Sequence, residues 1–201
     1  IITWAVVSMI YGALMALVSK DLMRFVSHTS ISHFGFMIFG IFANFEVRNG
    51  PRQGIYVING ANDNLLTGIV THGHNGSGIQ IVSSSRNTFQ YITTYDIFDR
   101  INSKNQPGED ADGIGISSGR DNVISHVLAY DNADDGIDAW KSTYTMIEYT
   151  VVHSNGRGSH GNGNGIKAGG GIDNYTTVRH TIAYNNKAVG FTNNSGRHIS
   201  F

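Results

Sequence analysis

Four of the chain's 15 acidic residues fall within the stretch AYDNADDGIDAWKS, residues 129–142. Neighbouring carboxylates raise one another's pKa unless a cation joins them, and several oxygen ligands gathered at one place are what Ca²⁺ takes in proteins. Asp is also favoured at tight turns, where its side chain bonds nearby backbone amides, and a turn is enough to explain Asp131. The group of Asp134, Asp135 and Asp138 exceeds what a turn requires and predicts a metal site.

A repeat surrounds these residues and predicts how they are positioned. A glycine followed by Ile or Phe recurs at positions 54, 78, 113, 136, 165 and 190. Between these glycines, segments such as NTFQYITTYDI and NVISHVLAYDN alternate apolar and polar residues, as half-buried strands do. Short repeated strands with Asn- and Gly-rich corners predict an all-β fold, a right-handed parallel β-helix over residues 45–201. A leucine-rich repeat would need a Leu lattice that is missing, and a β-sandwich has no reason to repeat one motif in register.

Stacked coils turn sequence positions into spatial neighbours, because paired strands lie about 4.8 Å apart. Asp138 and Lys167 both stand two residues after a repeat glycine, so we expect them to be neighbours. Asp112 and Asp135 both stand just before one, and Asp134 lies beside Asp135 on the same coil. The repeat therefore predicts that the four aspartates form one calcium-binding patch with Lys167 beside it. The glycines around Lys167, in GNGNGIKAGGG, indicate an open approach to that lysine.

The amino-terminal part of the chain has a different character. Residues 1–18, IITWAVVSMIYGALMALV, contain no charged residue and suit a helix that spans a bilayer, and a second apolar run covers residues 31–43. We therefore expect residues 1–44 to form a hydrophobic α-helical segment or hairpin, with membrane association through residues 1–43. A signal peptide or a buried helix is the alternative, although no basic region precedes the first run.

Composition narrows the function classes. Charged residues make up 14% of the chain and the net charge is -1, which argues against nucleic acid as a partner. Cysteine is absent, so disulfides, thiolate metal sites and Cys nucleophiles are excluded. His72 and His74 could ligate zinc, but no third ligand follows at a recognisable spacing, and an exposed loop is the preferred interpretation.

Four strings, DADGIGI, NADDGIDAWKS, GNGNGIKAGG and AYNNKAVGFTNNS, follow in this order between about residues 46 and 196. Together they resemble polysaccharide lyase family nine, the pectate and polygalacturonate lyases built on a right-handed parallel β-helix. The resemblance implies that Asp112, Asp134, Asp135 and Asp138 bind Ca²⁺ and that Lys167 is the Brønsted base. It also implies a secreted or extracellular monomer that acts on acidic polysaccharide (polygalacturonate or pectin). The protein would be membrane-anchored if residues 1–43 serve as an anchor.

A second resemblance concerns the amino-terminal segment. The string YGALMALVSKDLMRFVSHTSISHFGFMIFGIF is similar to the antiporter-like chain M subunit of proton-pumping NADH:quinone oxidoreductase, over roughly forty residues. In that family the lysine matching Lys20 lies near the proton path. One helical hairpin cannot form such a path, since buried ionisable groups need partners from neighbouring helices. The similarity therefore implies membrane affinity at most, and leaves open a chimeric fragment that carries a piece of this subunit.

The chemistry expected from these residues is β-elimination. Ca²⁺ would bridge the aspartates to a uronate carboxylate, and Lys167, with its pKa lowered by the ion and by partial burial, would take the C5 proton. Candidates for contact with uronate carboxylates across the groove are Arg157, His160, Lys187 and Arg197, and the default alternative is that these side chains are solvated at the surface. Glycoside hydrolysis by two carboxylates is one alternative, but that mechanism gives Lys167 no catalytic role. A non-catalytic β-helix that binds or displays glycan is the other.

Overall fold

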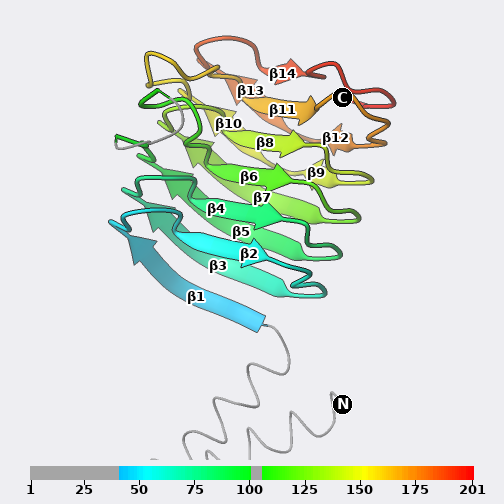
Figure 1. The fold of residues 1–201 in the computed structure, drawn as a ribbon, viewed down its shortest axis with the longest axis horizontal. Helices are drawn as coiled ribbons and strands as arrows, with labels where there is room; N and C mark the ends of the chain where they lie inside the picture. The colour runs from blue at the N-terminus through cyan, green and yellow to red at the C-terminus, as the bar shows by residue number, and fades with distance from the viewer. Residues whose placement is uncertain (1–40, 101–105) are drawn as a thin grey trace, which may run out of the picture. The chain divides into compact units, whose positions relative to one another are not determined.

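The computed structural model describes residues 41–100 and 106–201. The chain divides into two units, Ile1–Phe42 and Ala43–Phe201, and the second unit is a solenoid of short parallel strands (Figure 1). The helical segment predicted over residues 1–44 lies outside the described residues except at its end, where residues 41–44 belong to strand β1 (Ile41–Arg48). Within the described ranges, no helix has the length and apolar character needed to cross a membrane.

Each coil of the solenoid contributes strands to two sheets, which confirms the predicted all-β parallel β-helix. The six strands of sheet B, in chain order, are β2 (Ile55–Ile58), β4 (Ile79–Val82), β6 (Ile114–Ser117), β8 (Ile137–Trp140), β11 (Ile166–Gly169) and β14 (Phe191–Thr192). The strands of sheet A are β1, β3 (Leu65–His72), β5 (Thr88–Tyr95), β7 (Val123–Tyr130), β9 (Met146–Glu148), β10 (Val151–His153), β12 (Thr177–Arg179) and β13 (Ile182–Tyr184). Figure 1 shows the two sets of strands stacked in the same order, coil upon coil.

Each repeat glycine stands immediately before a strand of sheet B, and there is a steric reason for glycine at this position. A Cβ added at Gly113 would lie 2.6 Å from the carbonyl oxygen of Gly136 on the next coil. A Cβ at Gly136 would lie 2.7 Å from the carbonyl oxygen of Gly165 in the same way. Real Cβ atoms do not approach a carbonyl so closely, so the coils can stack at this corner only if it carries no side chain.

Alternation along the strands separates the core from the solvent. In the central strands of sheet B the first and third residues point inward, as Ile137 and Ala139 do on β8, and both are completely buried. The second residues point outward, and the register aligns them from coil to coil, so that Gly115, Asp138 and Lys167 are successive partners. A single residue with positive φ bends the longer strands of sheet A, for example His126 at +53° in β7. The stack thus presents a regular column of outward side chains on sheet B.

Candidate active site

Lys167 and Asp138 face each other across the β11–β8 pair, as the repeat predicted. Lys167 Nζ lies 2.9 Å from Asp138 Oδ2 and 2.6 Å from Asp135 Oδ2. The side chain of Lys167 is 11% exposed and that of Asp135 is completely buried. The two charges of such a buried ion pair attract each other strongly, because the dielectric constant around them is low. Removing both charges from water also carries a large desolvation cost.

Three of the predicted metal ligands form a compact cluster. Oxygen atoms of Asp112, Asp134 and Asp135 all lie within 4.8 Å of one another, and all three residues are buried. Asp138 is not one of these three, but it joins them through Lys167, which contacts both Asp135 and Asp138. Asp112 and Asp135 precede β6 and β8 at equivalent positions, and the Asp135 amide donates to Asp112 Oδ1 at 3.1 Å.

One oxygen of each clustered carboxylate is held by a backbone amide. Asp112 Oδ1 accepts from the Asp135 amide, and Asp134 Oδ1 accepts from the amide of Asn162. Asp135 Oδ1 accepts from both the amide and the side chain of Asn164, at 2.7 and 2.9 Å. Fixed carboxylates of this kind are oriented before any ligand arrives.

The cluster carries more negative charge than its surroundings balance, and the pKa values show it. Burial, followed by the charges of Asp134, Asp138 and Asp135, raises the pKa of Asp112 well above its ordinary value. Burial is also the largest cause that raises the pKa of Asp134 to about 7, and Asp135 adds to it. The pKa of Asp138 rises to about 7, mainly by burial and against the lowering effect of Lys167.

The pKa of Lys167 in the site without an ion is set by the neighbouring aspartates, and the lowering expected from Ca²⁺ stays a prediction. Burial does lower the pKa of Lys167, but the charges of Asp138, Asp112 and Asp135 outweigh it and raise the pKa above its ordinary value. The reason is distance, because two of these carboxylates lie within 3 Å of the ammonium. Lys167 therefore serves as the counter-charge of the cluster as it stands.

The donor set suits a hard divalent cation. Ca²⁺ takes several carboxylate and carbonyl oxygens, and the three clustered carboxylates supply oxygens alone. Asp138 adds a further buried oxygen, Oδ1, for which no hydrogen-bond partner exists among the described residues. Asp112, Asp134, Asp135 and Asp138 are therefore the residues that could hold the ion.

A groove of about 660 Å³ runs over the outer face of sheet B and contains Asp138 and Lys167. Toward the amino-terminal coils it continues past Gly115, Gln80 and Tyr56 on β6, β4 and β2. Gly115 is the outward position without a side chain, and a Cβ there would lie 2.6 Å from Gln80 Oε1 and 3.1 Å from Asp112 Oδ2. The glycine thereby keeps Asp112 accessible from the groove.

The four residues expected to contact substrate do not line this groove. The ammonium of Lys187 donates to backbone carbonyls, including that of Gly161 at 2.9 Å. Arg157 pairs with Asp96 at 2.8 Å, and Arg197 pairs with the exposed Asp173. His160 is exposed beside the hydroxyl of Ser159. The geometry gives these side chains no place on the groove floor.

Sequence reasoning missed several residues that shape the site. Gln80, Gly115 and Trp140 line the groove at outward positions of sheet B, where the column rule could have found them. Trp140 stands two residues after Asp138 on β8 and is 40% exposed. Asn164 stands just before Gly165, in the column of Asp112 and Asp135, so the same rule could have found it. Asn162, which orients Asp134, lies in an irregular loop for which the sequence offers no comparable signal.

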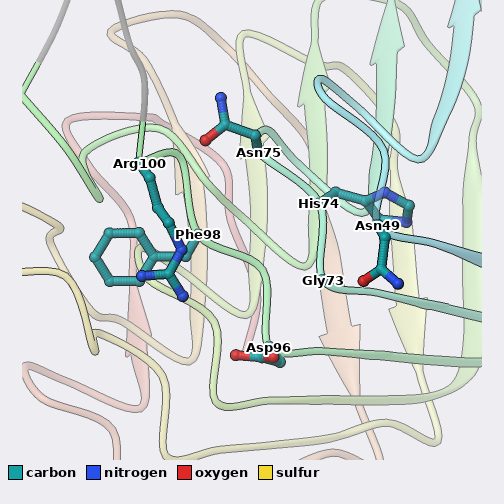
Figure 2. A pocket seen from close by; sticks show the side chains of 7 residues that line it. All are labelled: Asn49, Gly73, His74, Asn75, Asp96, Phe98 and Arg100. Atoms are coloured by element: carbon teal, nitrogen blue, oxygen red, sulfur yellow. The ribbon is translucent and has the colours of Figure 1, made fainter.

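A second hollow, of about 320 Å³, lies near the first coils (Figure 2). Figure 2 shows Arg100 beside Phe98, and these residues line the hollow together with His74 and Asp96. The exposed loop predicted for the histidines is wrong: His72 belongs to β3, and His74 is 2% exposed. His74 Nδ1 accepts from the Gly50 amide at 2.9 Å while Nε2 lies 3.0 Å from the Val47 carbonyl, so its nitrogens are occupied by backbone.

The NADH-oxidoreductase resemblance of the amino-terminal segment is borne out over a short stretch. The chain is 55% identical over 42 residues to NADH-quinone oxidoreductase subunit M of Mycobacterium tuberculosis (strain CDC 1551 / Oshkosh), which covers 21% of this chain and 8% of that protein. The matched stretch is thus a small piece of a much longer subunit.

Comparison of the remaining chain gives a consistent result. It is 33% identical over 177 residues to "Pectate lyase L" of Paenibacillus polymyxa (strain SC2), which covers 78% of this chain and 39% of that protein. Among solved structures, that of pectate lyase Pel9A matches with a TM-score of 0.63 and 30% identity, over 74% of this chain and 39% of that chain. The chain therefore spans about two fifths of the length of these relatives. The family described as "Pel9A-like, right handed beta helix region" matches residues 20–200, and the chain belongs to that family.

Proposed function

We propose that this chain carries the active site of a calcium-dependent pectate or polygalacturonate lyase, which cleaves an acidic polysaccharide by β-elimination. One observation carries the proposal: Lys167 Nζ lies 2.6 Å from the buried Asp135 and 2.9 Å from the partly buried Asp138, beside a cluster of three carboxylates and at the floor of an open groove. The names of the pectate lyases among its relatives support the same class of reaction.

The aspartates would hold Ca²⁺, and Lys167 would act as the base. A bound Ca²⁺ would pair with the uronate carboxylate, stabilise the enolate-like charge that develops there, and weaken the hold of the aspartates on the Lys167 proton. Neutral Lys167 takes the proton from C5, the C4–O bond breaks, and its electron pair leaves with the glycosidic oxygen, which solvent protonates. The product carries a C4–C5 double bond.

The groove would orient the polymer across the coils. Its floor passes from Tyr56 and Gln80 to Asp138 and Lys167, so a chain laid along it would present a sugar to the base. The polar floor residues can bond hydroxyl groups, and the exposed ring of Trp140 can pack against a pyranose face.

The direct test is to incubate the 201-residue chain with polygalacturonate, with added Ca²⁺ and with chelator, and to follow the ultraviolet absorbance of the unsaturated product. We expect absorbance to rise with Ca²⁺ and to stop when the chelator is added. Release of reducing ends without that absorbance would indicate hydrolysis instead. Binding of the polymer without any cleavage would indicate a glycan-binding β-helix.

A further inference from the structure

The loop between β10 and β11 closes around the side chain of Lys187. Lys187 Nζ donates to the carbonyl oxygens of Gly161 at 2.9 Å, Gly158 at 3.0 Å and Ser159 at 3.3 Å. An ammonium group has three hydrogens, so these three carbonyls use all of them. No ion pair of Lys187 is found within residues 41–100 and 106–201. Its ammonium group therefore works as a hydrogen-bonding centre for the loop.

The stem of Lys187 passes between the two ends of the same loop. A Cβ added at Gly156 would lie 2.5 Å from Lys187 Cβ, and one at Gly163 would lie 2.6 Å from it. Both glycines have positive φ, +94° and +73°, a conformation that side chains disfavour. The neighbouring amide of Ala188 donates to the Gly163 carbonyl at 2.8 Å. The glycines thus make room for this lysine, and the backbone beyond it ties the loop in place.

The opposite side of the loop contacts the carboxylate cluster. The Asn162 amide donates to Asp134 Oδ1, and the Asn164 amide donates to Asp135 Oδ1 at 2.7 Å. The Gly158 amide donates to the Ala133 carbonyl at 2.9 Å, one residue before the aspartates. The loop therefore lies between Lys187 and the two acids, and contacts both.

We propose that Lys187 is a positioning residue for the metal centre: by gathering the carbonyls of residues 158–161, it fixes the amides that orient Asp134 and Asp135. The inference rests on the proposed function, since it assigns the oriented oxygens to Ca²⁺. Groups that orient metal ligands from one step further out typically change metal affinity by about 10–100-fold when they are removed.

The test compares Lys187→Met with the unchanged chain by calorimetric titration of Ca²⁺. Methionine keeps most of the stem but removes the ammonium, so we expect Ca²⁺ to bind about 10–100-fold more weakly. When both proteins are measured without Ca²⁺, hydrogen exchange at the Asn162 and Asn164 amides should be faster in Lys187→Met than in the unchanged chain. Arg179→Met is the matched control, because Arg179 pairs with Glu148 on sheet A, and this variant should bind Ca²⁺ normally.

A second variant keeps the test decisive if Lys187→Met folds poorly. Asn162→Pro removes the amide that reaches Asp134, and it should weaken Ca²⁺ binding to a similar degree. The double variant should bind no more weakly than the poorer single variant, because both act through the same loop. Unchanged affinity in Lys187→Met, or an equal loss in Arg179→Met, would overturn the inference while the calcium site stands. If the unchanged chain binds no Ca²⁺, the proposed function fails and the inference fails with it.

Discussion

Lys167 and Asp138 occupy the same position on adjacent coils, and their side chains meet at 2.9 Å on the outer face of sheet B. This contact joins the candidate base to the candidate metal ligands, because the same ammonium lies 2.6 Å from Asp135. Proton removal and metal binding are therefore separable by substitution at this pair.

Substitution of the candidate base should abolish cleavage but preserve metal binding. Loss of a general base costs typically about 10²–10⁴-fold in rate, so Lys167→Met should lose unsaturated product to at least that degree. Its Ca²⁺ affinity should not fall, because removal of the ammonium leaves all four aspartates in place. Product absorbance and calorimetric titration measure the two properties. Arg86→Met, which breaks an exposed pair with Asp63, is the control, and retained activity in Lys167→Met would exclude it as the base.

Removal of one carboxylate from the cluster should stabilise the ion-free protein. Asn at position 112 keeps an oxygen for the Asp135 amide but removes a buried charge that three neighbouring aspartates oppose. Neighbouring like charges disfavour the charged form of each carboxylate, so removal of one carboxylate relieves this repulsion. We therefore expect Asp112→Asn to melt at a higher temperature than the unchanged chain in chelator, and to show no further rise with Ca²⁺. A Ca²⁺-dependent rise equal to that of the unchanged chain would remove Asp112 from the ligand set.

Acid should weaken the first coils through His74. Burial is the largest cause that lowers the pKa of His74, so the folded protein favours the neutral ring, whose Nδ1 accepts from Gly50. A base with a lowered folded pKa contributes stability above its unfolded value of about 6.5, and this stability is lost as the pH falls through the folded pKa. The free energy of unfolding should drop by up to about 1.4 kcal/mol per pH unit there.

Denaturant unfolding between pH 7.5 and 5 checks this expectation. His74→Gln, whose amide can accept and donate in place of the ring, should lose the acid-dependent part. His72→Gln should retain it, because His72 bonds the exposed Glu46 instead of the backbone between coils. Equal pH dependence in both variants would refute the assignment to His74.

The repeat glycines should differ in cost according to whether a coil follows them. Gly113→Ala places a Cβ 2.6 Å from the Gly136 carbonyl, and overpacking of this kind costs about 1–3 kcal/mol. Gly190 stands last in the same column, and its nearest contact would be the Ala183 Cβ at 3.1 Å. Gly190→Ala should therefore destabilise less in a thermal melt, and equal losses would contradict the steric explanation.

The fold and part of the site were predictable because in-register stacking converts position within a repeat into position in space. Asp112 lies beside Asp135, and Asp138 beside Lys167, because each pair occupies the same repeat position on adjacent coils. The target of Lys187 was not predictable by this rule, because the path of the loop it holds does not follow the repeat.

The ion-free pKa of Lys167 and the burial of His74 both have local causes that the sequence does not contain. The pKa of Lys167 is raised because the charges of nearby aspartates outweigh the lowering effect of burial. The sequence does not contain the short distances that produce this result. His74 stands in the polar string THGHNG but is buried, because Gly54 allows the neighbouring coil to approach the ring; a Cβ there would lie 2.5 Å from His74 Nε2.

The two longest spacings in the glycine repeat, 35 residues from Gly78 to Gly113 and 29 from Gly136 to Gly165, lengthen the same corner of two turns that are separated by one shorter turn. Their extra segments touch, since a Cβ on Gly108 would lie 2.6 Å from the Gly158 Cα. The shorter turns leave little room for new side chains, whereas the two long segments can change in length. Divergence among related proteins should therefore concentrate at this corner, where altered loops can change the candidate ion site without disturbing the stacked strands beneath it.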